Sequence, residues 1–598
     1  EEQVFELRGM QQLDFMDCFK KFGYTYGNQE NYKLDTIAHV VLGENKIDYS
    51  EYGTLHDLHT KNYQLYIDYN IKDVDIVDRL EDKTGLITLS MTIAYKALVN
   101  MTDSFGSVGV WDALLFNELR KRNIVVPPKV NNTKERKIEG AFVKDPQNGM
   151  HDWVMSFDLN SLYPHIIMQY NMSPETVIDD RYSGVNVDAL LGETDINVPE
   201  DYCMSATGQY FDKTKKGIVP EIIEGLYAER SALKKEMLEA EQRSQDDKSY
   251  ETERKIITLN NQQMAIKILM NSLYGALSNE FFRYYDIRVA ESITVSGQLT
   301  ILWAQKIINQ YLNKLLKTDE DYVVAIDTDS LYIRVGQLVN KALKGNVTID
   351  KGVKFLDRVA TEKFEPLLDK AYVRLCEYMN GYEQKMVMKR EVIADKGIWT
   401  GKKHYALNVH NSEGVQYAKP KLKIMGIEVV RSSTPMPCRT MLKDSIAVIM
   451  NHDEETTQAY IQECREKFNA LPAEDIAFPR SVSDAEKWRN RDTIYKKGCP
   501  IHVRGALLYN HHINTNKLDK KYQPIFSGEK IKFLYLKLPN TIHENVFAFQ
   551  TVIPDELNIR KYVDYELQFD KSFLEPLKTI LDAIGWRTEK YVTLEDFF

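Results

Sequence analysis

The sequence predicts an α+β protein made of several structural units. Its 598 residues correspond to about four units, at roughly 150 residues per domain. Two long passages have helical composition, Glu221 to Gln242 and Glu251 to Leu277, and the polar residues between them predict the exposed tip of a helical hairpin. Short apolar runs that are typical of strands precede Asp158 and Asp327. Long helices and short strands together indicate the α+β class.

The rest of the chain divides where its composition changes. Up to about Leu80 it combines short strand-like runs with a helical segment, Tyr63 to Arg79. A mixed stretch follows and ends at Val125-Val126-Pro127-Pro128, where the prolines predict a boundary. A compact α/β region extends from about Gly140 to Pro220, and similar character returns after the helices as far as Met425.

Charge and cysteine usage narrow the class of protein. The net charge of −10 argues against a protein that simply coats nucleic acid, because neutralising phosphates requires a basic surface. The charge permits an enzyme with carboxylates around metal ions and a basic groove, and equally any other acidic enzyme. The six cysteines are scattered without a CxxC pair, which indicates a reducing compartment and no zinc site. No apolar run approaches the roughly 18 residues of a membrane helix, and no signal peptide opens the chain. The chain begins Glu1-Glu2-Gln3 without Met, as a processed product or fragment would.

Two segments carry carboxylates at the ends of apolar runs. Trp153 to Phe157 leads into Asp158, and the following turn is expected to close at Pro164. Two further apolar runs flank Asp327-Thr328-Asp329-Ser330, which predicts a β-hairpin with both carboxylates at its tip. Carboxylates beside an apolar core need a compensating charge, and Mg²⁺ supplies one while binding a few hard oxygen ligands. Two such ions can activate a hydroxyl and stabilise a departing oxygen in phosphoryl transfer. Any single Asp could instead simply cap a turn.

Polar and cationic side chains recur at helical spacing on both long helices. They are Tyr227, Arg230 and Lys234 on the first helix and Lys267, Asn271 and Tyr274 on the second. Cations projected from two antiparallel helices would clamp a triphosphate, and Arg can engage it with two hydrogen bonds. The ordinary alternative is a solvated charged face. The passage Ile268 to Gly275 is too apolar for a simple exposed face, which favours the clamp.

Three of these segments resemble, in order, the polymerase motifs of family B DNA polymerases of the T-even bacteriophage type. Asp158 to Pro164 resembles the first motif, Lys267 to Gly275 the second, and Asp327 to Ser330 the third. The resemblance implies a right-hand fold, with a palm whose antiparallel sheet bears the carboxylates, helical fingers and a mixed thumb. It also implies a DNA-directed DNA polymerase of phage replication, which extends a primer 3′-hydroxyl with dNTPs using two Mg²⁺ ions, for which Mn²⁺ can substitute.

The resemblance covers nearly the whole chain and implies its domain order. The segments are the end of a 3′–5′ exonuclease domain with a partial RNase H-like fold (1–85), a connecting segment of an amino-terminal domain (86–129), the palm (130–216 and 280–420), the fingers (217–279) and the thumb with a clamp-binding tail (421–598). The fingers are expected to be short, because only a brief polar turn joins their two helices.

The same resemblance assigns the metal site. Asp158 and Asp329 would bind the metals together with the backbone of Leu159. Asp327 would support them, and Glu391 matches a further acidic position nearby. Before the Asp-Thr-Asp this chain has Ile326, where the family usually has Gly, so we expect a local packing change without loss of a metal ligand.

The implied nucleotide site combines the first motif with the two helices. Its residues would be Ser161, Leu162, Tyr163, Arg230, Lys234, Lys267 and Asn271. Lys267 would also donate a proton to the leaving pyrophosphate. Tyr274 and Gly275 would lie beside the nascent base pair. Tyr163 would sit beneath the deoxyribose and exclude a 2′-hydroxyl, although a core aromatic is an equal alternative.

DNA and clamp contacts are implied by weaker motifs. Lys402, Lys403 and Tyr405 resemble a Lys-Lys-Arg-Tyr element that contacts the primer, with His404 in place of Arg, and Lys421 and Lys423 resemble the entry to the thumb. Such contacts position a duplex without reading its sequence. The tail from Thr593 resembles a peptide that docks on a sliding clamp, and its apolar anchors would be Leu594, Phe597 and Phe598. A frayed terminus is the equal alternative.

Near the amino end, Tyr69 to Val74 resembles the third motif of the family's proofreading exonuclease. Asp73 would bind a metal and Tyr69 would orient the attacking water. No Asp-x-Glu precedes this motif, and two-metal hydrolysis cannot run on one carboxylate. We therefore expect no proofreading by this chain alone, and we hypothesise that a separate polypeptide supplies the front half, as in a split polymerase gene.

Two rival functions share part of the pattern. A metal-dependent glycosyltransferase also uses Asp-x-Asp, but it needs neither the cationic hairpin nor an upstream Asp158. A catalytically inert replication accessory protein would not need intact Asp158, Asp329 and Lys267. We therefore expect an active polymerase that acts on primer-template DNA and dNTPs, without membrane association, in the cytoplasm of the infected bacterial host.

Overall fold

Six antiparallel strands form the sheet that carries the predicted carboxylates. The structure is a computed structural model that describes residues 9–133, 136–243, 249–344 and 347–590. The sheet has the order β5-β6-β1-β7-β8-β9. Its strands are β1 (Gly149–Leu159), β5 (Val323–Asp327), β6 (Ser330–Arg334), β7 (Met388–Gly401), β8 (His404–Ser412) and β9 (Val415–Met425). Strand β1 pairs with both β6 and β7, so its end is fixed on two sides.

The two faces of this sheet are buried in different cores. Met155 and Phe157 of β1 lie in the largest core together with residues of the long helix α11 (Ile287–Leu316). Val154 points the other way and joins a smaller core that contains Tyr332, Trp399 and Tyr405. Successive residues of a strand point to opposite faces, which explains why the apolar run before Asp158 is continuous.

Two long helices form the predicted helical hairpin. They are α9 (Ile218–Arg243) and α10 (Tyr250–Leu277), and they pack against each other as expected. Residues 244–248, in the predicted polar tip, lie outside the described residues. Further along, α10 buries Ile266, Met270 and Leu273 in the core shared with the sheet, which holds the hairpin against the carboxylate region.

Residues 9–130 contain helices without strands, contrary to the expected mixture. The helices are α1 (Phe15–Phe22), α2 (Leu34–Leu42), α3 (Leu55–Lys61), α4 (Tyr63–Thr84), α5 (Leu86–Ala97) and α6 (Ser107–Lys121). No strand occurs before β1 in the described part of the chain, so the prediction of strands was wrong there. In α2, the run that contains Val40 and Val41 buries Ile37, Ala38 and Val41 on one helical face. The helical segment predicted from Tyr63 is confirmed, whereas a partial RNase H-like fold stays a prediction.

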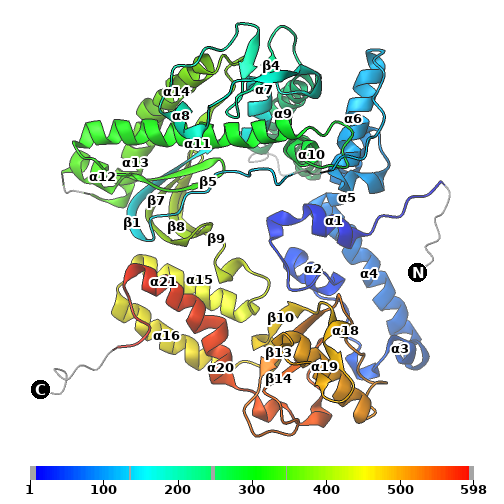
Figure 1. Ribbon diagram of the computed structural model, residues 1–598. Coiled ribbons are helices and arrows are strands. Elements are labelled where there is room, and N and C mark those ends of the chain that lie inside the picture. The colour runs from blue at the N-terminus through cyan, green and yellow to red at the C-terminus, as the bar shows by residue number, and fades with distance from the viewer. Residues whose placement is uncertain (1–8, 134–135, 244–248, 345–346, 591–598) are drawn as a thin grey trace, which may run out of the picture.

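These amino-terminal helices join the hairpin to the carboxy-terminal unit (Figure 1). Ala265 and Leu269 of α10 belong to the core formed by α1, α2, α4 and α5. Trp111 of α6 donates its indole N–H to the carbonyl of Leu269 at 3.0 Å. On the other side, Glu30 pairs with Arg439 at 3.1 Å. The amino-terminal helices therefore contact both neighbours.

The carboxy-terminal unit mixes helices with a small sheet around its own core. Its helices are α15 (Met436–Asn451), α16 (Glu454–Asn469), α17 (Ala473–Ile476), α18 (Ala485–Trp488), α19 (Ile501–Thr515), α20 (Tyr565–Phe569) and α21 (Glu575–Ile584). Its strands are β10 (Phe478–Ser481), β13 (Lys530–Tyr535) and β14 (Val546–Phe549), with a separate pair β11 (Arg489–Asn490) and β12 (Ile494–Tyr495). Helix α21 packs back on β7, which ties this unit to the main sheet.

Shorter elements complete the region around the main sheet. They are α7 (Leu162–Gln169), β2 (Val177–Arg181), α8 (Val187–Leu191), β3 (Tyr202–Met204), β4 (Gln209–Asp212), α12 (Gly336–Leu343), α13 (Ile349–Val359) and α14 (Glu365–Tyr378). Helix and antiparallel sheet together confirm the α+β class, whereas the palm, fingers and thumb layout stays a prediction. All six cysteines are free. Within the described residues, every helix is too short or too polar to cross a bilayer.

Gly426 offers a test of the junction between the main sheet and the carboxy-terminal unit. Its φ is +70°, and a Cβ there would lie 2.0 Å from the carbonyl oxygen of Lys403. Gly414 has a φ of +89° but open space around it. We expect Gly426→Ala to lower the apparent melting temperature more than the control Gly414→Ala. Gly414→Ala meets only the backbone strain of about 1 kcal/mol, whereas Gly426→Ala also displaces the β7–β8 turn. Equal effects in tryptophan-fluorescence melts would contradict the close approach.

Candidate active site

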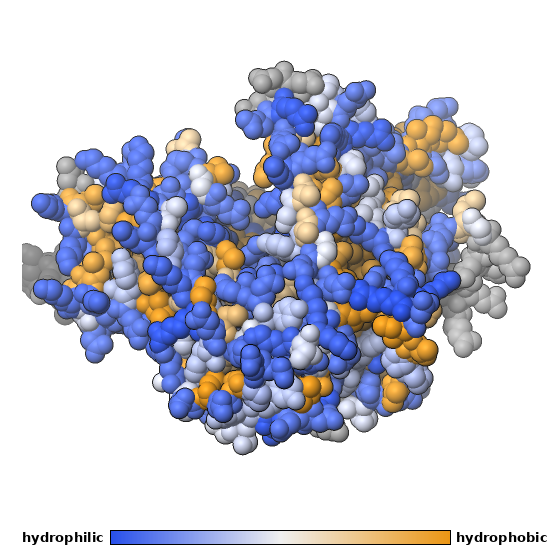
Figure 2. All heavy atoms as spheres, turned by 90° about the horizontal axis from the view of Figure 1, so that it is seen from above, coloured by the Kyte–Doolittle hydropathy of each residue, from blue (hydrophilic) through white to orange (hydrophobic). Residues whose placement is uncertain are grey.

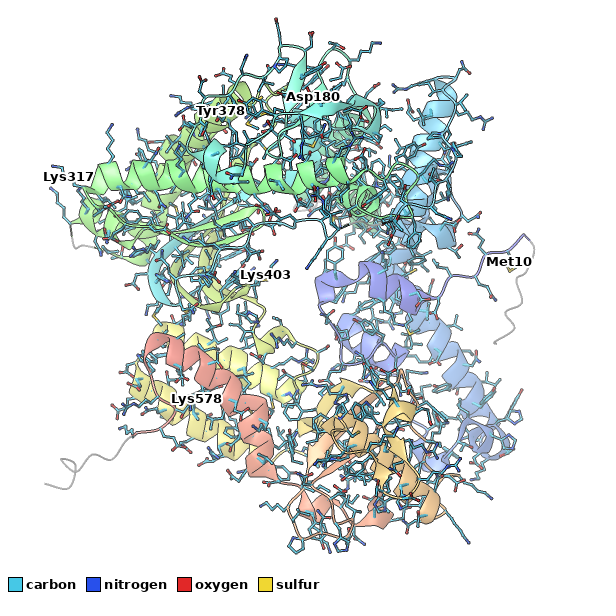
Figure 3. All side chains as sticks on the ribbon, in the orientation of Figure 1. Met10, Asp180, Lys317, Tyr378, Lys403 and Lys578 are labelled. Atoms are coloured by element: carbon cyan, nitrogen blue, oxygen red, sulfur yellow. The ribbon has the colours of Figure 1, made fainter. Side chains whose placement is uncertain are left out.

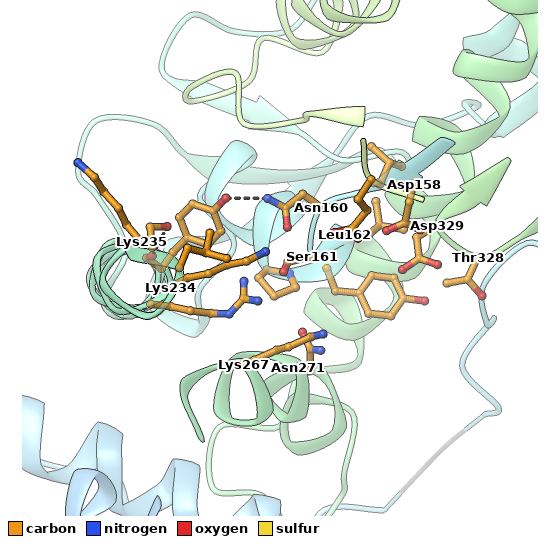
Figure 4. Close-up of a pocket in the computed structure, with 18 residues that line it drawn as sticks. Asp158, Asn160, Ser161, Leu162, Lys234, Lys235, Lys267, Asn271, Thr328 and Asp329 are labelled. Atoms are coloured by element: carbon orange, nitrogen blue, oxygen red, sulfur yellow. Dashed lines mark hydrogen bonds between the residues drawn. The ribbon is translucent and has the colours of Figure 1, made fainter. Parts of the chain in front are cut away.

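Asp158 and Asp329 are brought together by strand pairing. The Ser330 hydroxyl donates to a carboxylate oxygen of Asp158 at 2.8 Å, and the Leu159 N–H donates to the carbonyl of Asp329 at 3.0 Å. These bonds tie the end of β1 to the β5–β6 hairpin. Two residues distant in sequence thus present their carboxylates side by side (Figure 4).

The predicted hairpin is confirmed. Asp327 pairs with Ser330 across a two-residue turn, in which Thr328 adopts a φ of +62°. The Thr328 N–H donates to the carbonyl of Phe142 at 3.1 Å, which anchors the turn. Ile326 is buried in the main core, so this departure from the usual Gly is accommodated by packing.

The turn after β1 differs from the prediction. It does not close at Pro164, because α7 begins at Leu162 and places Pro164 in its first turn. Proline is tolerated there, since the first N–H groups of a helix have no intrahelical acceptor. Ser161 makes the bend with a φ of +48°. The chain therefore reverses within Asn160 and Ser161, immediately beside Asp158.

Burial disfavours the charged forms of both central carboxylates. Burial raises the pKa of Asp158 to about 7, and the charge of Asp329 adds to this shift. Burial likewise raises the pKa of Asp329, with contributions from the charges of Asp327 and Glu391. No ion-pair partner of Asp158 or Asp329 is found among the described residues. Two adjacent carboxylates of raised pKa fit a divalent cation, which would compensate both.

The flanking carboxylates, in contrast, are neutralised by lysines. Asp327 pairs with Lys403 at 2.8 Å, and Glu391 pairs with Lys423 at 2.6 Å. The Ser156 hydroxyl also donates to Glu391 at 3.1 Å. Among the described residues, no group of three His, Cys, Asp or Glu side chains is placed to hold a metal ion by itself. Asp158, Asp329 and nearby backbone oxygens would therefore need ligands from a substrate to complete a cation's shell.

One cavity of about 780 Å³ joins the carboxylates to the helical hairpin (Figure 4). Its lining residues are Asp158, Leu159, Asn160, Ser161, Leu162, Tyr163, Pro164, Tyr227, Arg230, Ser231, Lys234, Lys235, Leu238, Lys267, Asn271, Thr328, Asp329 and Glu413. All seven residues predicted to bind the triphosphate are among them. Carboxylates lie at one end and cations at the other, as a metal-bound polyphosphate would require.

The cations of the cavity are free to bind an anion. Lys234 of α9 and Lys267 of α10 have no ion-pair partner within the described residues. Arg230 is half-buried, burial lowers its pKa, and its buried Nε has no hydrogen-bond partner in the described part of the chain. A buried guanidinium without an acceptor is costly unless a ligand supplies one. These three cations are therefore candidates for binding an anion.

Several cavity residues were not predicted from the sequence. They are Asn160, Pro164, Ser231, Lys235, Leu238, Thr328 and Glu413. Ser231 lies four residues after Tyr227, and Lys235 lies four residues after Ser231, so helical spacing could have found them. Asn160 donates to the Tyr227 hydroxyl at 2.7 Å and so connects the turn to α9. Glu413 comes from the distant β8–β9 turn, for which the sequence carries no signal.

Tyr163 packs between the hairpin and α11. Its ring centroid lies 4.8 Å from that of Tyr274. A Cβ on Gly297 of α11 would lie 3.2 Å from the Tyr163 ring. Burial raises the pKa of Tyr163 to about 12, so the phenol is neutral. Tyr274 and Gly275 do not line the cavity, but Tyr274 borders it through this ring contact.

The residues predicted to contact DNA occupy β7 to β9. Lys402 and Lys403 form the β7–β8 turn, and Lys403 lies on the side of the sheet that faces the carboxy-terminal unit (Figure 3). Lys402 pairs with Asp145 at 3.0 Å, and Lys421 lies 4.1 Å from the ring centroid of Tyr417. Tyr405 differs from the others, because it is only 4% exposed and its hydroxyl is 2.7 Å from that of Tyr332. The structure therefore does not offer the Tyr405 ring to a primer terminus.

The two predicted exonuclease residues do not line the cavity. Tyr69 and Asp73 occupy α4, where Lys46 pairs with Asp73 at 2.7 Å and lies 4.6 Å from the Tyr69 ring centroid. Asp73 thus has a lysine where the resemblance implies a metal. The predicted clamp-binding residues, Leu594, Phe597 and Phe598, lie outside the described residues.

Comparisons with known proteins identify the family. A family model described as DNA polymerase family B matches residues 106–486. The DNA-directed DNA polymerase of Escherichia phage RB69 is 34% identical over 653 aligned residues, which cover 100% of this chain and 71% of that protein. That of Enterobacteria phage T4 is 32% identical over 657 residues, with the same coverage. DNA polymerase 1 of Pyrococcus abyssi is 25% identical over 575 residues, which cover 94% of this chain and 63% of that protein. The resemblance predicted from the motifs is confirmed, and the chain belongs to DNA polymerase family B.

Proposed function

We propose that this chain is the DNA-directed DNA polymerase of a bacteriophage, extending a primer 3′-hydroxyl with dNTPs on a DNA template. The observation that carries the proposal is the shared cavity. It brings Asp158 and Asp329 within one enclosure with the unpaired cations of α9 and α10. Family membership excludes a glycosyltransferase. The intact carboxylate pair and free Lys267 argue against an inert accessory protein.

Divalent cations would be held by Asp158, Asp329 and the backbone of Leu159. We propose two Mg²⁺ ions, for which Mn²⁺ can substitute. When bound, they would lower the pKa of the primer 3′-hydroxyl and stabilise the leaving oxygen. Asp327 and Glu391 remain paired with Lys403 and Lys423, so their role is to shape the local field and hold the hairpin. The protein positions these groups through the β1–β6 pairing, before any substrate arrives.

The triphosphate would lie between the two helices. Arg230, Lys234 and Lys267 offer donors along the cavity, and Asn271 adds an amide one turn after Lys267. Ser161 and Leu162 of the turn line the same space. Lys267 can then pass a proton to the pyrophosphate as the bond to the α-phosphate breaks. This assigns binding to both helices and acid catalysis to α10.

Tyr163 would lie under the sugar. Its ring is fixed by Tyr274 and by the close approach of Gly297, so it cannot yield easily to a 2′-hydroxyl. Tyr274 and Gly275 would border the nascent base pair. We propose that the contact between Tyr163 and Tyr274 contributes both to the selection of deoxyribose and to the selection of base-pair shape.

The main sheet, the hairpin and the carboxy-terminal unit would serve as palm, fingers and thumb. Lys402, Lys403, Lys421 and Lys423 would contact the duplex, whereas Tyr405 would support them from within the sheet. Further proposals are docking of the carboxy-terminal tail on a sliding clamp and a separate chain that carries the front exonuclease parts. The phage relatives support action in the cytoplasm of the infected bacterial host.

Removing one central carboxylate tests the proposed reaction. We expect Asp329→Asn to reduce primer extension roughly 1,000-fold or more, because metal ions stabilise the transition state by several kcal/mol. The control is Asp350→Asn, which alters an exposed carboxylate on α13. Steady-state extension of a labelled primer on a defined template measures both. An active Asp329→Asn variant, or an inactive wild type, would refute the proposal.

Kinetic measurements can distinguish the role of Lys267 from that of Lys234. We expect Lys267→Ala to lower kcat by about 100-fold or more, as removal of a general acid does. Lys234→Ala should mainly raise the KM for dNTP, because it would contribute binding without proton transfer. Lys255→Ala is the control, since that lysine pairs with Glu236 on the hairpin surface. Equal kcat losses for Lys267→Ala and Lys234→Ala would contradict separate roles.

Metal affinity should depend on pH. With its pKa raised to about 7, Asp158 holds a proton that a cation must displace. The affinity for Mn²⁺ should therefore reach its full value above pH 7 and decrease as the pH falls below 7. At pH 5 the expected decrease is about 100-fold. Electron paramagnetic resonance of free Mn²⁺ at each pH measures this. Asp158→Asn should bind Mn²⁺ weakly and with a much flatter pH dependence. A wild-type affinity that is constant from pH 5 to 8 would show the assignment to be wrong.

A further inference from the structure

A second cavity, of about 710 Å³, lies in the carboxy-terminal unit. It is lined by α18, the β11–β12 hairpin, one face of α19 and the loop of residues 524–527. Helices α18 and α19 lie beside each other in that unit (Figure 1). Among the described residues, none lines both this cavity and the one that contains Asp158 and Asp329. Its volume is within the range of ligand-binding sites, and the proposed reaction leaves it without a role.

The β11–β12 hairpin supplies this cavity with positive charge. Arg489 and Arg491 line the cavity, and residues 486–497 contain five Lys and Arg side chains but only two carboxylates. Glu486, a carboxylate in the lining, lies 3.6 Å from Arg489 and its side chain is 81% exposed, so that ion pair is weak. Arg491 is exposed and has no ion-pair partner within the described parts of the chain. In a chain of net charge −10, this local excess of cations indicates an anionic ligand.

Asn510 of α19 fixes the loop that completes the cavity. Its amide group donates to the carbonyl of Ile525 at 2.7 Å, and its side-chain oxygen accepts from the Ile525 N–H at 2.8 Å. Ser527 accepts from the N–H of Ala485 at 2.9 Å, which ties the loop to α18. Asn514 lies one turn after Asn510 on the same face, and its amide has no hydrogen-bond partner in the part of the chain that the structure describes. The loop is therefore held at two points beside an amide that is free to bind a ligand.

Phe526 lies on this fixed loop and is 63% exposed. Its N–H donates to a carboxylate oxygen of Glu529 at 2.8 Å, so the backbone that carries the ring is also held. Exposed apolar side chains are scattered over the molecule, as the face in Figure 2 shows, and exposure alone indicates little. Phe526 differs because it occupies a fixed position in one cavity with Arg489 and Arg491. An aromatic ring beside cations binds single-stranded nucleic acid, because a base stacks on the ring while phosphates pair with the cations.

This combination fits a single strand better than a duplex or a free nucleotide. In a duplex the bases stack on one another, so only phosphates could contact the cavity and the Phe526 ring would have no partner. A single strand presents the faces of its bases to an aromatic side chain. A free nucleotide also has a base, but it lacks the successive phosphates that Arg489 and Arg491 could hold together.

We propose that this cavity binds a short stretch of single-stranded DNA, with a base on Phe526 and phosphates on Arg489 and Arg491. The Asn514 amide would donate to the same strand. Binding would not read the sequence, because every base has a face that can stack. The inference rests on the proposed function for the identity of its ligand, since a DNA polymerase works on single-stranded template. It adds a second DNA contact, outside the cavity of the carboxylates.

Photocross-linking of the full 598-residue chain tests the contact with Phe526. The probe is a thymidine oligonucleotide that carries 5-iodouracil, which cross-links to aromatic side chains on which it stacks. Peptide mass spectrometry locates the product. We expect a cross-link at Phe526 that saturates with oligonucleotide and that Phe526→Ala removes. Phe116→Ala is the control, because Phe116 is 43% exposed on α6 and should leave the cross-link unchanged.

Arg491 provides a second measurement at the same site. Arg491→Ala should raise the oligonucleotide concentration that half-saturates the Phe526 cross-link. It should also lower the slope of log affinity against log salt concentration by about 0.7, the effect of losing one phosphate contact on a single strand. Arg358→Ala removes an exposed arginine from α13 and should change neither quantity. Absence of the wild-type cross-link at Phe526, or equal slopes for the two arginine variants, overturns the proposal.

Competition and activity distinguish the remaining outcomes. Duplex DNA that displaces the cross-linking strand as well as unlabelled single strand does would assign the cavity to duplex phosphates and overturn the proposal. Thymidine monophosphate that competes equally well would assign it to a free nucleotide, with the same consequence. Primer extension by wild type is measured separately. Its failure refutes the proposed function, whereas loss of the cross-link with intact extension refutes only the single-strand site.

Discussion

The repulsion between two carboxylates is the constraint on which this active site depends. Asp158 and Asp329 are fixed side by side by backbone pairing of β1 with the β5–β6 hairpin, and burial disfavours their charged forms. Lysines neutralise the flanking Asp327 and Glu391 but leave the central pair uncompensated. This uneven distribution of lysines keeps a place for a cation from outside. A lysine at the centre would make the sheet more stable and the site inert.

The helical hairpin places positive charge at the other end of the cavity from the two carboxylates. Arg230, Lys234 and Lys267 line the same cavity without carboxylate partners among the described residues, so the charges of the two ends are separated by the space for a ligand. Each end of the cavity destabilises the fold when it is empty, because its unpaired charges are partly removed from water. A metal-bound triphosphate, as proposed above, would satisfy both ends together. The chemistry therefore follows from leaving two sets of charges unpaired within one cavity, and family membership agrees with this conclusion.

Local sequence predicted the features that depend on near neighbours. The apolar runs on either side of Asp327 and Asp329 dictate a hairpin, and helical spacing correctly grouped the cations of α9 and α10. The errors arose where tertiary packing decides. Short apolar runs near the amino end resemble strands, but the run in α2 folds as a helix that buries one face. Nothing near Tyr405 reveals that Tyr332 and Trp399 enclose its ring, and nothing near Glu413 brings it to the cavity.

The amino-terminal helices support the helix that carries Lys267. Leu89 and Ile93 of α5 share a core with Ala265 and Leu269 of α10, and Lys267 lies between those two positions. Trp111 of α6 also donates its indole N–H to the carbonyl of Leu269. A change in the packing of α5 or α6 would therefore displace α10, because packed cores transmit strain with little compliance. The position of Lys267 in the cavity thus depends on helices that lie far from it in the sequence.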